Sequence, residues 1–316
     1  MFGLVGDLGG TNARFAIAAV EAHRPVLTDC AALPAAEFRT PQAAARAYLN
    51  QIGIRRPLDF AVFAVAGPVT DGYVRFTNLA WELSAKVMGT ELGCDRVRLV
   101  NDFTAMAKSV PALSSEDLAR IGPDVPGTQG SAVTVLGPGT GFGVSCLVGE
   151  GAYETVLSTE GGHVPFAPQS DVERDVLKVL AGQFGRVSVE RILSGSGLVS
   201  LYHALAEISG RKVDGVAPRD VTSAAATGEA LAGKAVDLFC SILGAVAGDF
   251  VLAYGARGGV YIAGGIAPRL LNRLVAGPFR NSFEAKGRFV NYLKAVPTQV
   301  IMHPYAALIG AGRAAF

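Results

Sequence analysis

The sequence is poor in cysteine and has no excess of charge of either sign. Four cysteines occur in 316 residues, and no two of them form a Cys-x-x-Cys pair. This spacing disfavours a zinc site or a disulfide framework and predicts reduced, buried thiols in a cytoplasmic protein. Because 28 Lys and Arg stand against 27 Asp and Glu, no net field would attract nucleic acid or an anionic membrane. We therefore expect neither as a partner.

The sequence also lacks an uninterrupted apolar run long enough to cross a membrane. The most apolar stretch, 238–255, is split by Asp249, which leaves about half a membrane span and predicts a buried helix. No basic leader precedes the first apolar residues, and Asp7 interrupts them, so no signal peptide is expected. Hydrophobic residues, at 50% of the chain, and 39 glycines are abundant. This length and composition predict a large core divided between two domains.

The glycines form a recognisable pattern near the start of the chain. Residues 4–18 are predicted to form a strand, a polar turn at 7–12 and a second strand. Gly9 and Gly10 let the backbone approach a ligand closely, and a run of free N–H groups attracts anions. Asp7 would repel a bare phosphate but suits one that carries Mg²⁺. The alternative is an ordinary glycine-containing hairpin.

The same pattern recurs in the middle of the chain. A predicted strand at 132–136 leads into the glycine turn 137–143, and a second strand follows at 144–148. The recurrence suggests two related halves. An apolar strand, not a helix, follows the second turn, which argues against a dinucleotide-binding fingerprint, and the chain has no Gly-x-x-x-x-Gly-Lys-Ser/Thr motif. If these turns bind phosphate, they do so in neither of the two common ways.

Further elements are predicted from periodicity and capping signals. Thr40 and Pro41 are suited to begin a helix, and Ser188 is suited to begin another that has Glu190 in its first turn. The apolar pattern from 229 to 254 predicts one long buried helix. The other predicted strands are 59–66, 97–100, 259–263 and 299–302, and the other predicted helices are 104–109, 171–180, 198–208, 268–275, 279–289 and one from 305.

Polar residues follow these elements in three clusters. They are Asn101 with Asp102, Glu160 with His163, and Glu190. Carboxylates, an amide and an imidazole suit a neutral polyhydroxylated ligand, since they accept hydrogen bonds from hydroxyls and donate to them. The alternatives are structural: Asp102 would cap the helix that follows it, Glu190 would stabilise a helix dipole, and His163 would be a turn residue.

Six motifs together resemble the motif series of bacterial glucokinases. In chain order they are Asp7-Leu-Gly-Gly-Thr-Asn-Ala-Arg14, Asn101-Asp-Phe-Thr-Ala105, Gly137-x-Gly-Thr-Gly-x-Gly143, Glu160-Gly-Gly-His163, Glu190-Arg-Ile-Leu-Ser-Gly195 and Ile262-Ala-Gly-Gly-Ile-Ala-Pro268. One such motif would be a weak signal, whereas six in the family's order along the whole chain are a strong one. Related sugar kinases and repressors carry a cysteine-rich zinc motif that this chain lacks, so the resemblance is to the zinc-free branch.

The resemblance implies an α/β fold of the two-domain, actin-like (ribonuclease-H-like) sugar-kinase type, with a cleft between the domains. The small domain would comprise 1–110 plus 300–316, and the large domain 111–299. The implied reaction is phosphorylation of D-glucose at its 6-hydroxyl by ATP with Mg²⁺, carried out in the cytoplasm by a homodimer. A kinase for another hexose or an amino sugar, and a non-catalytic sugar sensor, are the alternatives.

The resemblance also implies a role for each motif. Asp102 would be the general base, and the sugar would be bound by Asn101, Asp102, Glu160, His163 and Glu190. The nucleotide would contact Gly6, Asp7, Leu8, Gly9, Gly10, Thr11, Gly139, Thr140, Gly141, Gly264 and Gly265. Asp7 would lie near Mg²⁺ through water, and Gly264 and Gly265 against adenosine unless they form only a strand-to-helix turn. Arg14 would support its loop, and Asn78 and Trp81 would either line the sugar side of the cleft or pack a loop.

Overall fold

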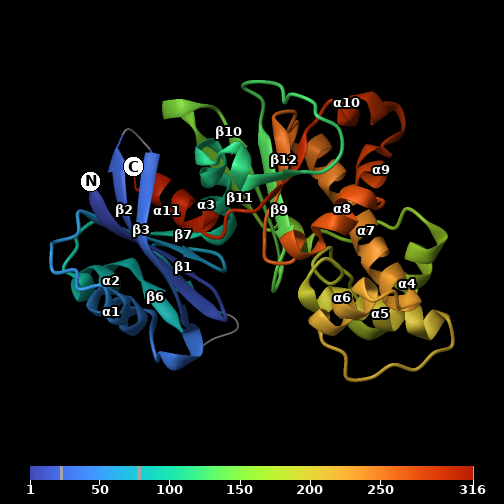
Figure 1. Ribbon diagram of the computed structural model, residues 1–316, viewed down its shortest axis with the longest axis horizontal. Coiled ribbons are helices and arrows are strands. Elements are labelled where there is room, and N and C mark those ends of the chain that lie inside the picture. Colours follow the sequence, from blue (N-terminus) through green and yellow to red (C-terminus); the bar gives the residue numbers. More distant parts are fainter. Residues whose placement is uncertain (22–23, 77–79, 316) are drawn as a thin grey trace. The chain divides into compact units, whose positions relative to one another are not determined.

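The structure, a computed structural model, describes residues 1–21, 24–76 and 80–315. The chain separates into two compact units (Figure 1). Unit 1 comprises residues 1–116 and 303–316, and unit 2 comprises residues 117–302. The domain boundaries expected from the sequence lie at about residues 110 and 300, and they stay a prediction.

Unit 1 is built on a five-stranded sheet in the order β3-β2-β1-β4-β7. Its strands are β1 (Phe2–Leu8), β2 (Asn12–Glu21), β3 (Arg24–Pro34), β4 (Phe60–Val65) and β7 (Val97–Asn101). The first three are antiparallel neighbours, while β1, β4 and β7 run parallel. In register, Leu8 stands opposite Val65, and Val65 stands opposite Asn101. The carboxyl ends of the parallel strands therefore meet at one edge of the sheet, which is where α/β sheets bind ligands.

Unit 2 repeats this arrangement. Its sheet has the order β11-β10-β9-β12-β13-β8. The strands are β8 (Leu118–Arg120), β9 (Val133–Pro138), β10 (Phe142–Val148), β11 (Thr155–Thr159), β12 (Gly259–Ile262) and β13 (Thr298–Ile301). As in unit 1, the first three long strands are antiparallel neighbours, and β9, β12 and β13 run parallel. The shared strand order confirms the prediction of two related halves.

Short helices flank the sheet of unit 1. The α-helices described there are α1 (Pro41–Gln51), α2 (Ala85–Leu92), α3 (Asp102–Ser109) and α11 (Ala306–Arg313), and β5 (Tyr73–Arg75) pairs with β6 (Glu82–Ser84) as a separate hairpin. Thr40 caps α1 as predicted, because its hydroxyl accepts the N–H of Ala43 at 3.1 Å. The α11 and α3 helices pack so closely that a Cβ added at Gly310 would lie 1.7 Å from the carbonyl oxygen of Ala105.

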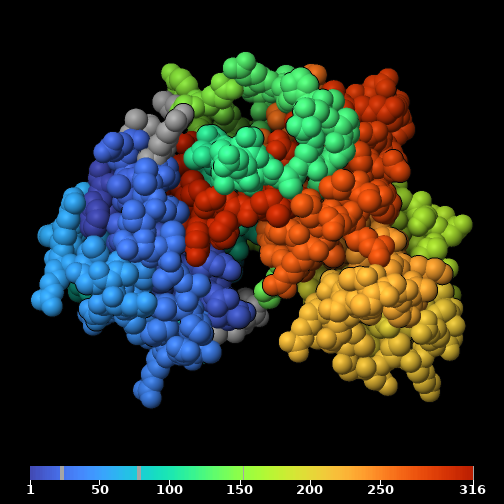
Figure 2. Space-filling view, viewed as in Figure 1, coloured from blue at the N-terminus to red at the C-terminus, as the bar shows by residue number. Residues whose placement is uncertain are grey.

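One long helix organises the core of unit 2. It is α7 (Ala230–Tyr254), which packs against α5 (Gly195–Ile208), α6 (Pro218–Ala226), α8 (Leu271–Ala276) and α9 (Phe279–Glu284). The remaining α-helices described are α4 (Asp171–Phe184) and α10 (Val290–Lys294). In Figure 2, the residues of α5 and α6, in yellow to amber, form a continuous part of the surface of this unit. By length and composition α7 could cross a membrane, but 72% of its apolar window is buried inside the protein. The predicted buried helix is confirmed.

One predicted helix, 188–193, is wrong, and another, 279–289, is too long. Residues 188–193 form turns, because their backbone is tied to a neighbouring segment: Val189 N–H donates to the carbonyl of Val164, and Glu190 N–H donates to that of Gly162. The predicted helix 279–289 is broken after α9, where Gly287 has a positive φ of 55°. The helix predicted for 198–208 begins earlier, at Gly195.

Candidate active site

The first glycine turn lies between β1 and β2, and a backbone hydrogen bond crosses it. The N–H of Gly9 donates to the carbonyl of Asn12 at 3.0 Å. Asp7, on β1, stands opposite Arg14 in register, and Arg14 Nη1 donates to Asp7 Oδ2 at 2.9 Å. Burial raises the pKa of Asp7, and the charge of Arg14 partly offsets this rise. The structure therefore gives Arg14 the supporting position that the sequence predicted for it.

Asn101 and Asp102 lie where β7 ends and α3 begins. Asn101 is the N-cap of α3, because its Oδ1 accepts the N–H groups of Phe103 and Thr104 at 3.0 and 3.1 Å. The N-cap position predicted for Asp102 as the structural alternative is therefore taken by Asn101. Asp102 is instead the first helical residue, and its Oδ1 also accepts the N–H of Phe103, at 2.9 Å.

Asn101 also connects two of the parallel strands of unit 1. Its Nδ2 donates to the carbonyl of Gly67 at 3.4 Å, just beyond the end of β4. Since β1, β4 and β7 end at the same edge, the first glycine turn, Gly67 and the Asn101–Asp102 pair share that edge. The structure thus brings the predicted residues of unit 1 together.

The second glycine turn connects β9 to β10 in unit 2 and lies against a helix N-terminus. Gly139 donates its N–H to the carbonyl of Gly141 at 2.8 Å and accepts the N–H of Gly195 at 3.0 Å. Gly195 is the first residue of α5, which Ser194 caps by accepting the N–H of Gly197 at 3.0 Å. A helix N-terminus is favourable for an anion such as phosphate. This contact was not predicted, although the run Ser194-Gly-Ser-Gly197 before an apolar stretch is a signal for a helix start.

Glu190 joins this turn to the predicted sugar-binding residues. Its Oε2 accepts the N–H of Phe142 at 2.9 Å, and a Cβ added at Gly141 would lie 2.4 Å from the same oxygen. Its own N–H donates to the carbonyl of Gly162 at 2.9 Å, within the turn that carries Glu160 and His163. The alternative reading of Glu190, as a carboxylate on a helix dipole, is wrong because no helix forms there.

The carboxylate of Glu160 and the imidazole of His163 face each other. His163 Nε2 lies 3.8 Å from Glu160 Oε2, and both side chains are more than half exposed. They follow β11, which runs in the same direction as β9, so they lie at the edge that carries the second glycine turn. The structure therefore groups Glu160, His163 and Glu190 with residues 139–141. This edge can offer carboxylate and imidazole groups to hydroxyls and backbone N–H groups to an anion.

Gly264 and Gly265 follow β12 at this edge as well. Gly264 has a φ of 86°, and a Cβ added there would lie 2.3 Å from the carbonyl oxygen of Pro138. Backbone conformation and close packing on β9 therefore explain this glycine by themselves. A role against adenosine stays a prediction.

Trp81 is part of the core of unit 1. It is 3% exposed, and its indole N–H donates to the carbonyl of Phe38 at 3.0 Å. These contacts favour the prediction that it packs a loop. Asn78, which was considered with it, lies outside the described residues.

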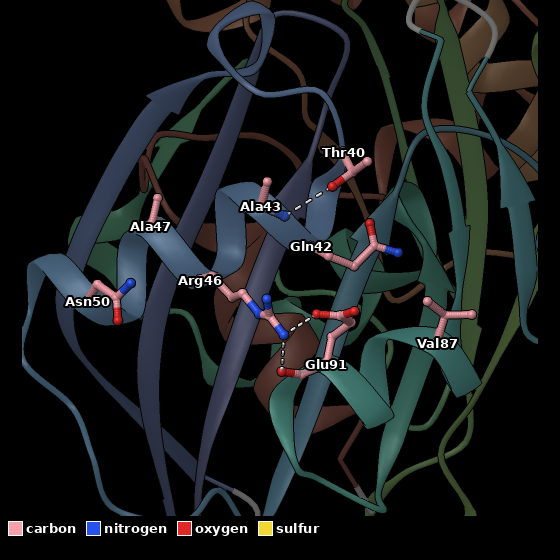
Figure 3. A pocket seen from close by; sticks show the side chains of 8 residues that line it. All are labelled: Thr40, Gln42, Ala43, Arg46, Ala47, Asn50, Val87 and Glu91. Atoms are coloured by element: carbon pink, nitrogen blue, oxygen red, sulfur yellow. Dashed lines mark hydrogen bonds and ion pairs between the residues drawn. The ribbon is translucent and has the colours of Figure 1, made fainter.

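Two hollows are lined by residues other than the predicted site residues. One, of about 640 Å³, lies between α1 and α2, where Arg46 reaches across to Glu91 (Figure 3). None of the predicted site residues lines it. A second, of about 130 Å³, is formed mainly by apolar side chains, Val164, Val189 and Phe250 among them, and offers little to a sugar. The described residues contain no group of three or more His, Cys, Asp or Glu placed to hold a metal ion.

Known proteins resemble this chain along its whole length. A family model described as Glucokinase matches residues 4–316. The glucokinase of Caulobacter sp. (strain K31) is 48% identical over 309 residues, which cover 98% of this chain and 93% of that protein. A crystal structure of a glucokinase from an Antarctic psychrotroph has a TM-score of 0.88 at 36% identity, with 98% and 97% of the chains covered. A ROK family glucokinase from Streptomyces griseus, in complex with glucose and AMPPNP, has a TM-score of 0.67 at 19% identity, with 99% and 98% covered. These likenesses confirm the predicted fold class.

Proposed function

The chain belongs to the glucokinase family, and on that premise we propose which of its residues carry the reaction. The reaction is the transfer of a phosphoryl group from ATP to the 6-hydroxyl of glucose, which gives glucose 6-phosphate. Asp102 is the general base in this proposal. Its carboxylate takes the proton of the 6-hydroxyl while that oxygen attacks the γ-phosphorus, and a positioned base contributes about 10²–10⁴ in rate.

The observation that carries this assignment is the division of roles at the start of α3. Asn101 occupies the N-cap and accepts the N–H groups of Phe103 and Thr104, so the helix start does not depend on Asp102 alone. The bond from the N–H of Phe103 to Asp102 Oδ1 orients the carboxylate at the edge of the sheet. An orienting bond of this kind is what a general base needs, because proton transfer depends first on geometry.

The other hydroxyls of the sugar would be bound by Asn101, Glu160, His163 and Glu190. The amide of Asn101 gives one N–H to Gly67 and has a second to donate. The carboxylates accept from hydroxyls, and the imidazole both donates and accepts. Two hydrogen bonds of Glu190 support this grouping. Its N–H donates to the carbonyl of Gly162, within the 160–163 turn, and its carboxylate accepts the N–H of Phe142.

The phosphates of ATP would be bound by the two glycine turns. These turns are residues 6–11 in unit 1 and 139–141 in unit 2, and the N–H groups offered to phosphate would be others than those of Gly9 and Gly139, which donate to Asn12 and Gly141. The N-terminus of α5 would add a favourable dipole. Gly264 and Gly265 would lie against the adenosine. In phosphoryl transfer, such alignment and charge neutralisation supply much of the catalysis.

The residues of the first turn fit a Mg²⁺ ion that arrives with the nucleotide. Mg²⁺ is usually held by one or two carboxylates, substrate phosphates and waters, which matches the single carboxylate of Asp7. Burial raises the pKa of Asp7, and a nearby cation would favour its charged form. When bound, the ion neutralises charge on the phosphates. Asp7 would hold it through water, while Arg14 keeps the carboxylate in place.

A homodimer in the cytoplasm completes the proposal. The four cysteines are all unpaired, as expected in a reducing compartment. The small domain would comprise 1–110 plus 300–316, and the large domain 111–299. Light scattering on the purified protein tests the dimer.

Replacing Asp102 tests the assignment of the base. Asp102→Asn keeps the shape of the side chain but cannot accept the proton, so kcat should fall by about 10² or more. Glucose binding, measured by calorimetry, should survive. Near-normal turnover in this variant would remove Asp102 from the proposed role.

Replacing Glu160 tests the sugar site. Glu160→Gln should weaken glucose binding by about tenfold or more, since hydrogen bonds to a charged acceptor are the stronger ones, and it should leave AMPPNP binding unchanged. Calorimetry with each ligand measures both. A variant that loses nucleotide affinity instead would place the sugar elsewhere. ATP consumption with glucose, mannose, fructose and N-acetylglucosamine in turn separates glucose from the other sugars.

A further inference from the structure

The hydroxyl of Thr159, the last residue of β11, has all of its hydrogen-bonding capacity in use. It donates to the carbonyl of Val144 at 2.9 Å. It accepts the N–H of Gly161 at 3.2 Å and the phenolic O–H of Tyr254 at 3.5 Å. A hydroxyl has one donor and two acceptor lone pairs. This side chain therefore connects the sheet, the glycine after Glu160, and α7.

The ring of Phe250 packs against the turn at residues 160–163. A Cβ added at Gly161 would lie 2.8 Å from Phe250 Cζ and 2.9 Å from Val144 Cβ, so the turn lies directly on these side chains. Phe250 also stacks on Tyr254, with ring centroids 5.5 Å apart. Both rings belong to α7, the long buried helix of unit 2.

The rest of the turn is fixed through its backbone carbonyls. Gly162 O accepts the N–H of Glu190 at 2.9 Å, and His163 O accepts from Arg186 Nη2 at 2.7 Å. The side chains of Glu160 and His163 are nevertheless 66% and 57% exposed. The turn thus combines a fixed backbone with exposed polar side chains, which is the arrangement expected of a preorganised binding element.

We propose that Thr159 is a positioning residue for sugar binding, which holds Glu160 and His163 in their binding geometry with Tyr254 and Phe250 as its support. This inference rests on the proposed sugar-binding role of Glu160 and His163. A turn that is ordered before the ligand arrives loses less conformational freedom on binding. Removing the Thr159 hydroxyl leaves the N–H of Gly161 without its acceptor and loosens the turn.

The test compares three variants of one strand. Thr159→Val keeps the shape of the side chain and removes the hydroxyl, whereas Thr159→Ser keeps the hydroxyl. Thr155→Val is the matched control, because Thr155 is the exposed first residue of β11. For Thr159→Val we expect the Kd and KM for glucose to rise about tenfold, below the roughly 10²-fold cost that a 1 Å misplacement can have. Thr159→Ser should stay near the wild-type values, and Thr155→Val should equal them.

Three further measurements separate positioning from general damage. The Kd for AMPPNP should not change in Thr159→Val, and kcat at saturating glucose should change less than KM does. Tyr254→Phe, which removes a single hydrogen bond to Thr159, should raise the KM for glucose by a smaller factor and serves if Thr159→Val does not fold. Normal glucose affinity in both Thr159→Val and Tyr254→Phe, or equal loss of both ligands, would overturn the proposal. If Glu160→Gln weakens glucose binding while these variants do not, the proposed sugar site stands and the positioning role fails.

Discussion

The two glycine turns occupy the same place in their sheets but differ in what surrounds them. In unit 1, a Cβ added at Gly9 would meet one described atom within 4 Å, the carbonyl oxygen of Asn12, at an ordinary 3.4 Å. In unit 2, a Cβ at Gly137 would lie 1.9 Å from Ala263 O, and one at Gly141 would lie 2.4 Å from Glu190 Oε2. The backbone of Ala263 therefore requires glycine at position 137, at the end of β9, and a Cβ at Gly141 would have to displace the carboxylate of Glu190. At Gly9 the described residues impose no such requirement.

The turns also differ in how charge is supplied to them. The first is preceded by Asp7, which is paired across the hairpin with Arg14. Residues 137–143 contain no charged side chain, and the second turn takes its carboxylate from Glu190, 48 residues beyond Phe142. Repeated topology thus determines where a glycine turn lies, while the residues that fix it come from different parts of each unit.

The largest effect should come from crowding the second turn. Gly141→Ala would displace the carboxylate of Glu190, because the new Cβ would lie 2.4 Å from its Oε2. We expect kcat/KM for glucose to fall by about 10²-fold, which is what a misplacement of about 1 Å can cost, and the free energy of unfolding to fall by about 1–3 kcal/mol. Steady-state kinetics and urea denaturation measure the two effects.

Gly139→Ala is the matched control within the same turn. No described atom lies within 4 Å of a Cβ added at Gly139, so its stability should match that of the parent protein. Equal stability in the two variants would show that the side chain of Glu190 moves aside with no loss of stability. The second turn would then tolerate a Cβ as the first turn does.

A smaller and more selective effect is expected from the first turn. Gly9→Ala should leave the free energy of unfolding unchanged or raise it by about 0.4–1 kcal/mol, because alanine restricts the unfolded chain. AMPPNP binding should nevertheless weaken by about tenfold, since a methyl group would hinder the close approach of a phosphate to the backbone. Calorimetry and urea denaturation separate these outcomes. Lost stability with normal nucleotide affinity would reverse the interpretation of this turn.

Local signals in the sequence predicted both strand–turn–strand units, the cap of α1 and the buried α7. Three edge strands, β3, β8 and β11, were not predicted. The exposed, irregular pattern of β11, with Leu157 49% exposed, lacks the alternation that identifies a half-buried strand. The β3 strand at the other sheet's edge went unpredicted as well. Such edge strands form because they pair with a neighbouring strand, and the local sequence pattern does not show that pairing.

The contacts within the candidate site were also not predictable from local sequence patterns. The motifs identified Asn101, Asp102 and Glu190, but their contacts depend on residues that are distant in the sequence. The turn at 188–193 looked helical because Ser188 and Glu190 suit a helix start, yet hydrogen bonds to Gly162 and Val164 hold it in another conformation. Similarly, the contact between Gly195 and Gly139 joins segments more than 50 residues apart. Tertiary hydrogen bonds overrode the local preference at 188–193, whereas α5 forms where a helix was predicted and its contact with Gly139 adds to it.

The smallest expected effect is a pH dependence that belongs to the first turn alone. Burial raises the pKa of Asp7, with Arg14 acting in the other direction. The native state therefore keeps this proton to a higher pH than the unfolded chain, whose aspartates titrate near pH ~3.9. The contribution of Asp7 to the free energy of unfolding therefore falls as the pH rises from about 4 through the raised pKa, by about 1.4 kcal/mol for each unit by which the pKa is raised. Asp7→Asn, which cannot lose a proton, should lack this fall.

Urea denaturation of both proteins between pH 4.5 and 8 measures the difference. The stability of Asp7→Asn relative to the parent should increase with pH and level off once Asp7 is ionised in the native state. A constant offset for Asp7→Asn would mean that Arg14 fully compensates the burial of Asp7, and the two turns would then not differ in their response to pH.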